Sequence, residues 1–258
     1  MARGEFIQYL DSDDLLRPRK FEIQVKALRE RPDCGVAYGY ACLWDGDRIA
    51  QETPFKWTGH EIPELFPALL VDRWWTTNTP LYRRIVCDAI GEWSDLRWSQ
   101  DWEYDGRVGA LRTKLVHCKE WVCDWRRHSG ERQTSPADWR EPFRASERKR
   151  FLGALFGHAR RAGVASETRE MQHFSRWLFQ TARLCGAAGL AADAKECFAW
   201  AKEAAGARRS MGSDFRLYEL AAWSLGWRAT GALACLIDEH VRRRPGQATL
   251  PPSWASSG

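Results

Sequence analysis

An apolar segment that runs directly into a cluster of acids places the strongest constraint on this chain. Residues 5–10 have the composition of a β-strand, and Asp11, Asp13 and Asp14 follow within four positions. Carboxylates crowded at a strand end repel one another, and a divalent cation removes that repulsion while bridging to phosphate oxygens. The sequence therefore indicates a metal–diphosphate site after this strand. Helix capping by Asp13 or Asp14 is the structural alternative.

The composition changes near residue 140, which predicts two domains within the 258 residues. Strand-type runs stop at about Pro142, and alanine becomes abundant after it. We expect an α/β domain over residues 1–140 and an α-helical domain over residues 141–258, with a disordered tail from Pro245.

Hydrophobic periodicity and turn signals predict the individual elements. In the first helix Phe21, Val25 and Leu28 form the expected apolar face. We expect strands at 5–10, 34–44, 48–53, 76–82 and 114–127, and helices at 18–31, 62–71, 85–90, 101–108, 144–162, 168–186, 191–205, 214–228 and 230–243.

Positive charge is concentrated in the second half of the chain. Residues 141–258 carry 18 basic and 11 acidic side chains, whereas residues 1–140 carry 21 basic and 23 acidic ones. Such an excess suggests an anionic surface nearby, such as a membrane leaflet, although a solvated helix face is the commoner origin. The basic clusters lack interleaved aromatic residues, which argues against nucleic acid as a partner.

Cysteine usage and hydropathy favour a cytoplasmic protein. The eight cysteines form no CxxC pair, which argues against a structural zinc site, and no signal peptide is recognisable. Scattered cysteines in such a chain are typical of reduced thiols. The most apolar segment, Leu220–Ile237, has Arg228 near its middle, which disfavours a membrane span. We expect a buried helix there, with a membrane-surface role as the alternative.

An ordered series of motifs over residues 2–128 resembles glycosyltransferase family 2. In that family an A-x-G-E strand leads into a D-x-D-D motif and a Leu-x-Pro helix start, as residues 2–20 do here. The resemblance implies an α/β fold: the C-terminal half of a GT-A (Rossmann-like, mixed sheet) glycosyltransferase domain, followed by an all-α helical domain. The further matching segments are Cys34–Gly39, Thr79–Arg84, Ile90–Trp93, Gln100–Tyr104 and Trp125–His128.

The resemblance also implies which residues bind the donor. Asp11 and Asp13 would hold Mg or Mn together with the diphosphate of a nucleotide sugar, and His128 would be a third metal ligand. Arg126 and Arg127 would contact the phosphates. A surface position is the structural alternative for His128.

The implied activity is metal-dependent, inverting transfer of a sugar from a nucleotide sugar (UDP-, dTDP- or GDP-linked) to a saccharide or lipid-linked acceptor. Asp101 would be the general base that removes the proton of the acceptor hydroxyl, and a helix cap is its structural alternative. The expected setting is cell-envelope or exopolysaccharide assembly, in the cytoplasm or at the inner face of the membrane, where the basic helical half would make a peripheral contact.

Two alternatives stay open at this point. Family members carry nucleotide-binding β-α units before the D-x-D-D strand, and no such units precede residue 5 here. The chain is then either a non-catalytic binding or scaffold module, inactive alone, or the product of a coding sequence that begins upstream of Met1.

Overall fold

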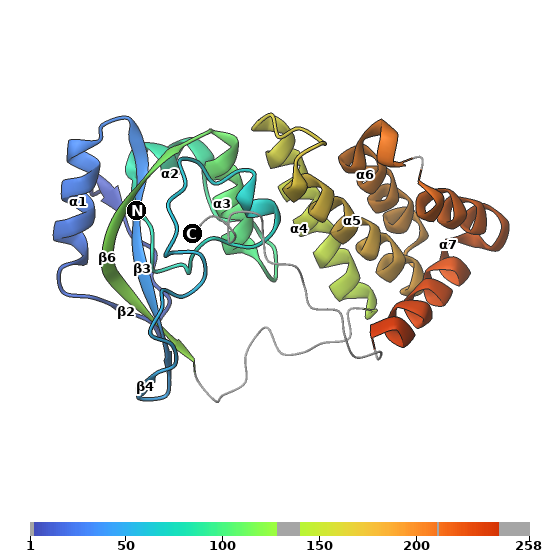
Figure 1. Cartoon of the computed structure of the whole chain (residues 1–258), viewed down its shortest axis with the longest axis horizontal. Coiled ribbons are helices and arrows are strands. Elements are labelled where there is room, and N and C mark those ends of the chain that lie inside the picture. The colour runs from blue at the N-terminus through green and yellow to red at the C-terminus, as the bar shows by residue number, and fades with distance from the viewer. Residues whose placement is uncertain (1–2, 128–139, 211, 243–258) are drawn as a thin grey trace. The chain divides into compact units, whose positions relative to one another are not determined.

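The computed structural model describes residues 3–127, 140–210 and 212–242 (Figure 1). It divides into two compact units, which are described separately below. The first comprises Met1–Asp95 and Gln100–Ser135, and the second comprises Leu96–Ser99 and Pro136–Gly258. The predicted border at residue 140 follows a segment outside the described residues and stays a prediction.

The first unit is built on a mixed sheet with the strand order β1-β5-β3-β6-β2. The two long strands, β3 and β6, are parallel, while β5 is antiparallel to both β1 and β3. The short strand β4 pairs only with β3, and β2 pairs antiparallel with β6. The strands are β1 (Phe6–Ile7), β2 (Leu15–Leu16), β3 (Cys34–Asp45), β4 (Arg48–Ile49), β5 (Leu81–Arg83) and β6 (Lys114–Arg127).

Strand β3 is buried over most of its length, as its apolar composition requires of a central strand. Its pairing with β6 shifts register near Tyr38 and Tyr40, where Gly39 lies against the neighbouring backbone. A Cβ atom at Gly39 would lie 2.5 Å from the carbonyl oxygen of Glu120. Glycine is therefore required here by close approach of the two strands.

Three α-helices and one 3-10 turn complete the first unit. Helix α1 packs on β3 and β6, and α3 carries Asp101 in its first turn. The predicted helix over 62–71 is wrong except for one 3-10 turn, because Pro63 and Pro67 remove two of the amide donors that an α-helix needs. The elements are α1 (Lys20–Glu30), η1 (Ala68–Leu70), α2 (Arg84–Ile90) and α3 (Gln100–Ala110).

The buried face of α1 differs from the predicted apolar stripe. Lys20, Gln24 and Leu28 are buried, whereas the side chain of Phe21 is 47% exposed. Both polar side chains donate to the carbonyl oxygen of Thr79, Lys20 Nζ at 2.7 Å and Gln24 Nε2 at 3.0 Å. These bonds offset the cost of burying the two groups and fasten α1 to the segment before β5.

The second unit is a set of helices: α4 (Pro142–Arg161), α5 (Arg169–Ala187), α6 (Ala191–Ser210) and α7 (Ser213–Arg242). Gly206 and Gly226 have φ of 75° and 79°, so α6 and α7 each break at a glycine. Aromatic side chains from α5, α6 and α7 form its core: Phe179, Phe198, Phe215 and Tyr218. The two units together confirm the predicted fold class, an α/β domain followed by helices.

Candidate functional site

The acidic run lies in the turn between β1 and β2. Asp11 and Asp13 are exposed, whereas the side chain of Asp14 is buried. The amide of Asp14 donates to the carbonyl oxygen of Asp11 at 3.2 Å, which closes the turn. The two predicted metal ligands therefore face solvent, and the third acid points into the protein.

A chain of side-chain contacts connects this turn to the predicted base. The Thr77 hydroxyl acts on Asp11 to lower the pKa of that carboxyl, and the same hydroxyl oxygen accepts a hydrogen bond from Arg73 Nη1 at 3.3 Å. Arg73 Nη1 also binds Oδ2 of Asp101. Asp11 and Asp101 are 90 positions apart in the sequence, yet they share the positive charge of one arginine.

The acids of this cluster act on one another electrostatically. Partial burial raises the pKa of Asp11, and the hydrogen bond from Thr77 and the charge of Arg73 oppose that rise. The nearby carboxylates of Asp101 and Asp13 raise it further. An added cation in this turn would lower the pKa of Asp11, because it would favour the ionised form.

Arg73 is held in place by Asp105, which is buried. Asp105 Oδ2 accepts from Arg73 Nε at 2.8 Å and from Trp75 Nε1 at 3.1 Å, while Oδ1 accepts from the Tyr82 hydroxyl at 2.9 Å. Burial raises the pKa of Asp105, and the charge of Arg73 opposes it. These contacts fix the guanidinium in the orientation that reaches Asp101.

Asp101 itself is held from two sides in the first turn of α3. Its Oδ1 accepts the amide of Trp102 at 2.8 Å, and its Oδ2 accepts from Arg73. The side chain keeps 36% of its surface exposed, so a substrate hydroxyl can approach it. Asp101 therefore accepts a backbone amide at the start of the helix, as its structural alternative predicts, and its carboxylate is exposed at the same time.

Asp14 lies in an environment that strongly disfavours its charge. Its Oδ1 accepts the backbone amide of Arg126 at 3.1 Å, and its Oδ2 is buried without a hydrogen-bond partner among the described residues. Burial raises the pKa of Asp14 to about 7, and the Arg126 amide offsets this only in part. The structure thus brings the end of β6 against the acidic run through Asp14 and a backbone amide.

The other residues predicted to bind the nucleotide sugar or the metal are Arg126 and Arg127, at the end of β6, and His128. Arg127 is exposed, and its Nη1 lies 3.9 Å from Oδ2 of Asp45 at the end of β3. Arg126 is half-buried next to it. His128 lies outside the described residues. Within residues 3–127, 140–210 and 212–242, no three histidine, cysteine or acidic side chains are grouped so that they could hold a metal ion.

Sequence reasoning did not find Arg73, Asp105 or Thr77 as members of this cluster. One signal was available, because Asp101 and Asp105 are four positions apart and so lie on the same face of a helix. Arg73 lies in an apolar stretch beside two tryptophans, where a charged side chain needs a partner. The identity of that partner depends on tertiary packing.

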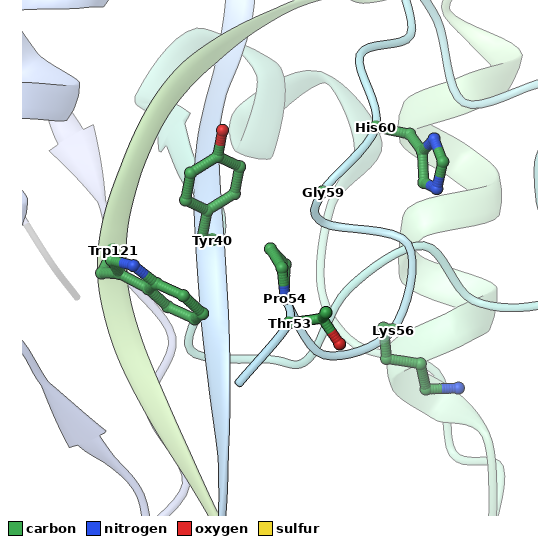
Figure 2. A pocket seen from close by; sticks show the side chains of 7 residues that line it. All are labelled: Tyr40, Thr53, Pro54, Lys56, Gly59, His60 and Trp121. Carbon is green, nitrogen blue, oxygen red and sulfur yellow. The ribbon is translucent and has the colours of Figure 1, made fainter. Parts of the chain in front are cut away.

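A pocket of about 500 Å³ opens beside β3 and β6 in the same unit (Figure 2). The rings of Tyr40 and Trp121 form one wall, with centroids 5.5 Å apart. The segment from Thr53 to His60 forms the other wall. Lys56 in that segment binds Oδ1 of Asp72 at 2.9 Å, and Asp72 directly precedes Arg73. One wall of the pocket is therefore connected, through the ion pair of Lys56 with Asp72, to the residue next to the arginine that binds Asp101.

Comparison with known proteins shows a likeness in fold. No protein-family model matches the chain, and no curated protein matches it. Among solved structures, it is similar to residues 1–349 of TarS from S. aureus, a glycosyltransferase crystallised with UDP-GlcNAc. The TM-score is 0.54 at 13% sequence identity, over 94% of this chain and 69% of the TarS chain.

This likeness extends over both units of the chain. An α/β domain with a mixed sheet, followed by a set of helices, is therefore an architecture that also occurs in a glycosyltransferase, as the sequence predicts. At 13% identity the likeness concerns the fold, and individual residues and reactions need separate arguments.

Proposed function

We propose that this chain is a glycosyltransferase of the family 2 type, which transfers a sugar from a nucleotide sugar to a saccharide or lipid-linked acceptor with inversion at the anomeric carbon. One observation carries the proposal. Arg73 forms an ion pair with Asp101, the predicted base, and its positive charge also acts on Asp11 of the D-x-D-D motif. The motif that the resemblance assigns to the donor and the residue that it assigns to the base are therefore close enough to serve one site, which supports the proposal.

In the proposed reaction Asp101 accepts the proton of the acceptor hydroxyl. The hydroxyl oxygen bonds to the anomeric carbon as the bond from that carbon to the diphosphate oxygen breaks, and the diphosphate leaves with the electron pair. Arg73 keeps the Asp101 carboxylate oriented through an ion pair that is itself anchored on buried Asp105. Arg73 is therefore a positioning residue in this scheme.

The metal belongs to the proposal as well. Asp11 and Asp13 offer hard oxygen ligands on an exposed turn, which are the donors that Mg²⁺ and Mn²⁺ prefer. Burial raises the pKa of Asp11, and the nearby carboxylates of Asp101 and Asp13 raise it further; a bound cation would offset the repulsion among these carboxylates. A bound divalent cation would neutralise charge on the leaving diphosphate. Arg126, Arg127 and His128 stay candidates for phosphate and metal contacts.

The neighbouring pocket is the proposed seat of a saccharide acceptor. Tyr40 and Trp121 offer aromatic surfaces of the kind on which sugar rings stack, and the opposite wall supplies polar groups (Figure 2). The coupling of the pocket to Arg73 through Lys56 and Asp72 supports this assignment. TarS was crystallised with UDP-GlcNAc, so UDP-GlcNAc is the first donor to test.

The proposal is tested by binding of UDP in the presence of Mn²⁺, measured by calorimetry on the whole chain. Asp13→Ala should weaken Mn²⁺-dependent binding by about tenfold or more, since it removes a charged ligand. Asp47→Ala is the matched control, because Asp47 is also an exposed acid in a turn of the same unit. It should bind as the wild type does.

A panel of UDP-, GDP- and dTDP-sugars then tests turnover, with release of the nucleoside diphosphate as the readout. Release of the nucleoside diphosphate that requires both Asp13 and Mn²⁺ would support the proposed glycosyltransferase activity. Absence of both binding and release in the wild type would instead favour the alternative from the sequence, a non-catalytic binding or scaffold module.

A further inference from the structure

Helix α7 presents a large apolar face to solvent. Of the fourteen large apolar side chains that are exposed in the described part of the chain, seven lie on this one helix. Trp223 is the most exposed of them, at 85%. A patch of this kind on a soluble domain marks a surface that contacts something else. The seven are Leu217, Leu220, Trp223, Leu225, Leu233, Leu236 and Ile237.

The opposite face of α7 is already occupied by the core of its own unit. Phe215 stacks on Phe179 of α5 with ring centroids 4.7 Å apart, and Tyr218 packs edge-on against the same ring at 5.1 Å. In the second half of the helix Gly231 lies against the backbone of α5, so that a Cβ atom there would be 2.7 Å from the Arg183 carbonyl oxygen. The exposed leucines cannot turn inward without displacing these contacts.

The charged side chains of α7 indicate what kind of surface its apolar face contacts. Three acids of α7 have side chains that the structure describes, and all three are paired: Asp214, Glu219 and Asp238 bind Arg176, Lys202 and Arg183, which belong to α5 and α6. Arg216 and Arg228 are exposed, and neither has an acidic partner within the described residues. Among the side chains of α7 that the structure describes, the unpaired charge is therefore positive, which is complementary to an anionic lipid surface.

The geometry of α7 argues against a membrane span. Ser213–Asp238 is long and apolar enough to cross a bilayer by length and composition alone, with a mean hydropathy of 1.3. Gly226, however, has φ of 79° and ψ of 158°, which divides the helix into two segments. Each segment is shorter than the about 20 residues that a helical span needs, and Arg228 lies just after the break.

We propose that α7 docks on the surface of a membrane that contains anionic lipids. Trp223 and the exposed leucines enter the boundary between headgroups and acyl chains, and Arg216 and Arg228 contact the lipid phosphates. This interaction does not depend on the proposed glycosyltransferase activity, because it uses side chains of the second unit only.

Flotation of the whole protein with vesicles tests the proposal. The wild type should float with vesicles of phosphatidylcholine mixed with phosphatidylglycerol, more weakly with pure phosphatidylcholine, and less at high salt. Leu220→Asp and Trp223→Asp should each lower the partition coefficient by about tenfold or more. Arg216→Gln with Arg228→Gln should lower it by about fivefold for each arginine, on the anionic vesicles alone.

Ile85→Asp is the matched control, because Ile85 is 72% exposed in the first unit, and it should float as the wild type does. These side chains are exposed, so the variants should unfold at the temperature of the wild type. Absence of wild-type flotation would overturn the proposal. So would a stable self-associated form in ultracentrifugation that Trp223→Asp dissociates while vesicle binding stays absent, since α7 would then be covered by a second copy.

Discussion

Arg73 and Asp105 form an ion pair inside the α/β unit, with Nε and Oδ2 2.8 Å apart. The side chain of Arg73 is 10% exposed and that of Asp105 is 1% exposed. The same guanidinium reaches out to Asp101, at the surface of the candidate site. A buried acid thus controls the position of an exposed one through a single arginine.

Replacing Arg73 should be costly to the fold. Arg73→Met leaves Asp105 as a buried carboxylate without its charged partner, and we expect a loss of about 3–5 kcal/mol in the free energy of unfolding. The matched control is Arg112→Met, which removes an exposed pair with Glu64 and should cost at most about 1 kcal/mol. Denaturant unfolding measures both. Similar small losses in the two variants would show that the buried pair contributes no more than a surface one.

Asp14 should make the protein less stable as the pH rises. Its pKa is about 7 in the folded state and 3.8 as its reference value, so between these values the folded chain binds more protons than the unfolded chain. The contribution of Asp14 to the free energy of unfolding must therefore fall from about pH 4 to pH 7. Asp14→Asn removes the titrating group while it keeps an acceptor for the Arg126 amide.

The difference between wild type and Asp14→Asn isolates this contribution from those of other groups. In denaturant unfolding at a series of pH values, Asp14→Asn should gain stability relative to the wild type as the pH rises through this window. A difference that does not change with pH would contradict the assigned pKa of Asp14.

Gly39 should not tolerate a side chain. An alanine Cβ there would lie 2.5 Å from the Glu120 carbonyl oxygen and 2.8 Å from Cγ1 of Val122, and the first of these is backbone that cannot turn away. We expect Gly39→Ala to lower the free energy of unfolding by about 1–3 kcal/mol. At Gly157, inside α4, the nearest atom would be 4.0 Å away. Gly157→Ala should therefore stabilise slightly, and equal effects of the two changes in thermal unfolding would contradict this packing.

The sequence predicted those elements whose signal is local. The bounds of β6, Lys114–Arg127, agree with the predicted strand, whose signal was the alternation around Val116, Cys118, Trp121 and Cys123. The breaks in α6 and α7 fall at glycines, close to the predicted helix ends. The predicted strand over 76–82 narrows to Leu81–Arg83, since only these residues meet partners in β1 and β3.

What local patterns could not predict is the use of polar side chains inside the fold. Periodicity placed Phe21 on the buried face of α1, yet Lys20 occupies it because its ammonium finds the Thr79 carbonyl oxygen from a distant segment. The same reason explains why the motifs led to Asp11 and Asp101 but not to Arg73. Its partners are 28 and 32 positions away, and no spacing rule connects them.

The most direct test of the proposed site is the turnover of Asp101→Asn. Asparagine has nearly the same shape but cannot accept the acceptor proton, so kcat for sugar transfer should fall by about 10²–10⁴-fold while the KM for the nucleotide sugar stays near that of the wild type. Thermal unfolding of the variant checks that the fold survives the loss of the ion pair with Arg73. Wild-type kcat in a folded Asp101→Asn variant would contradict Asp101 as the base.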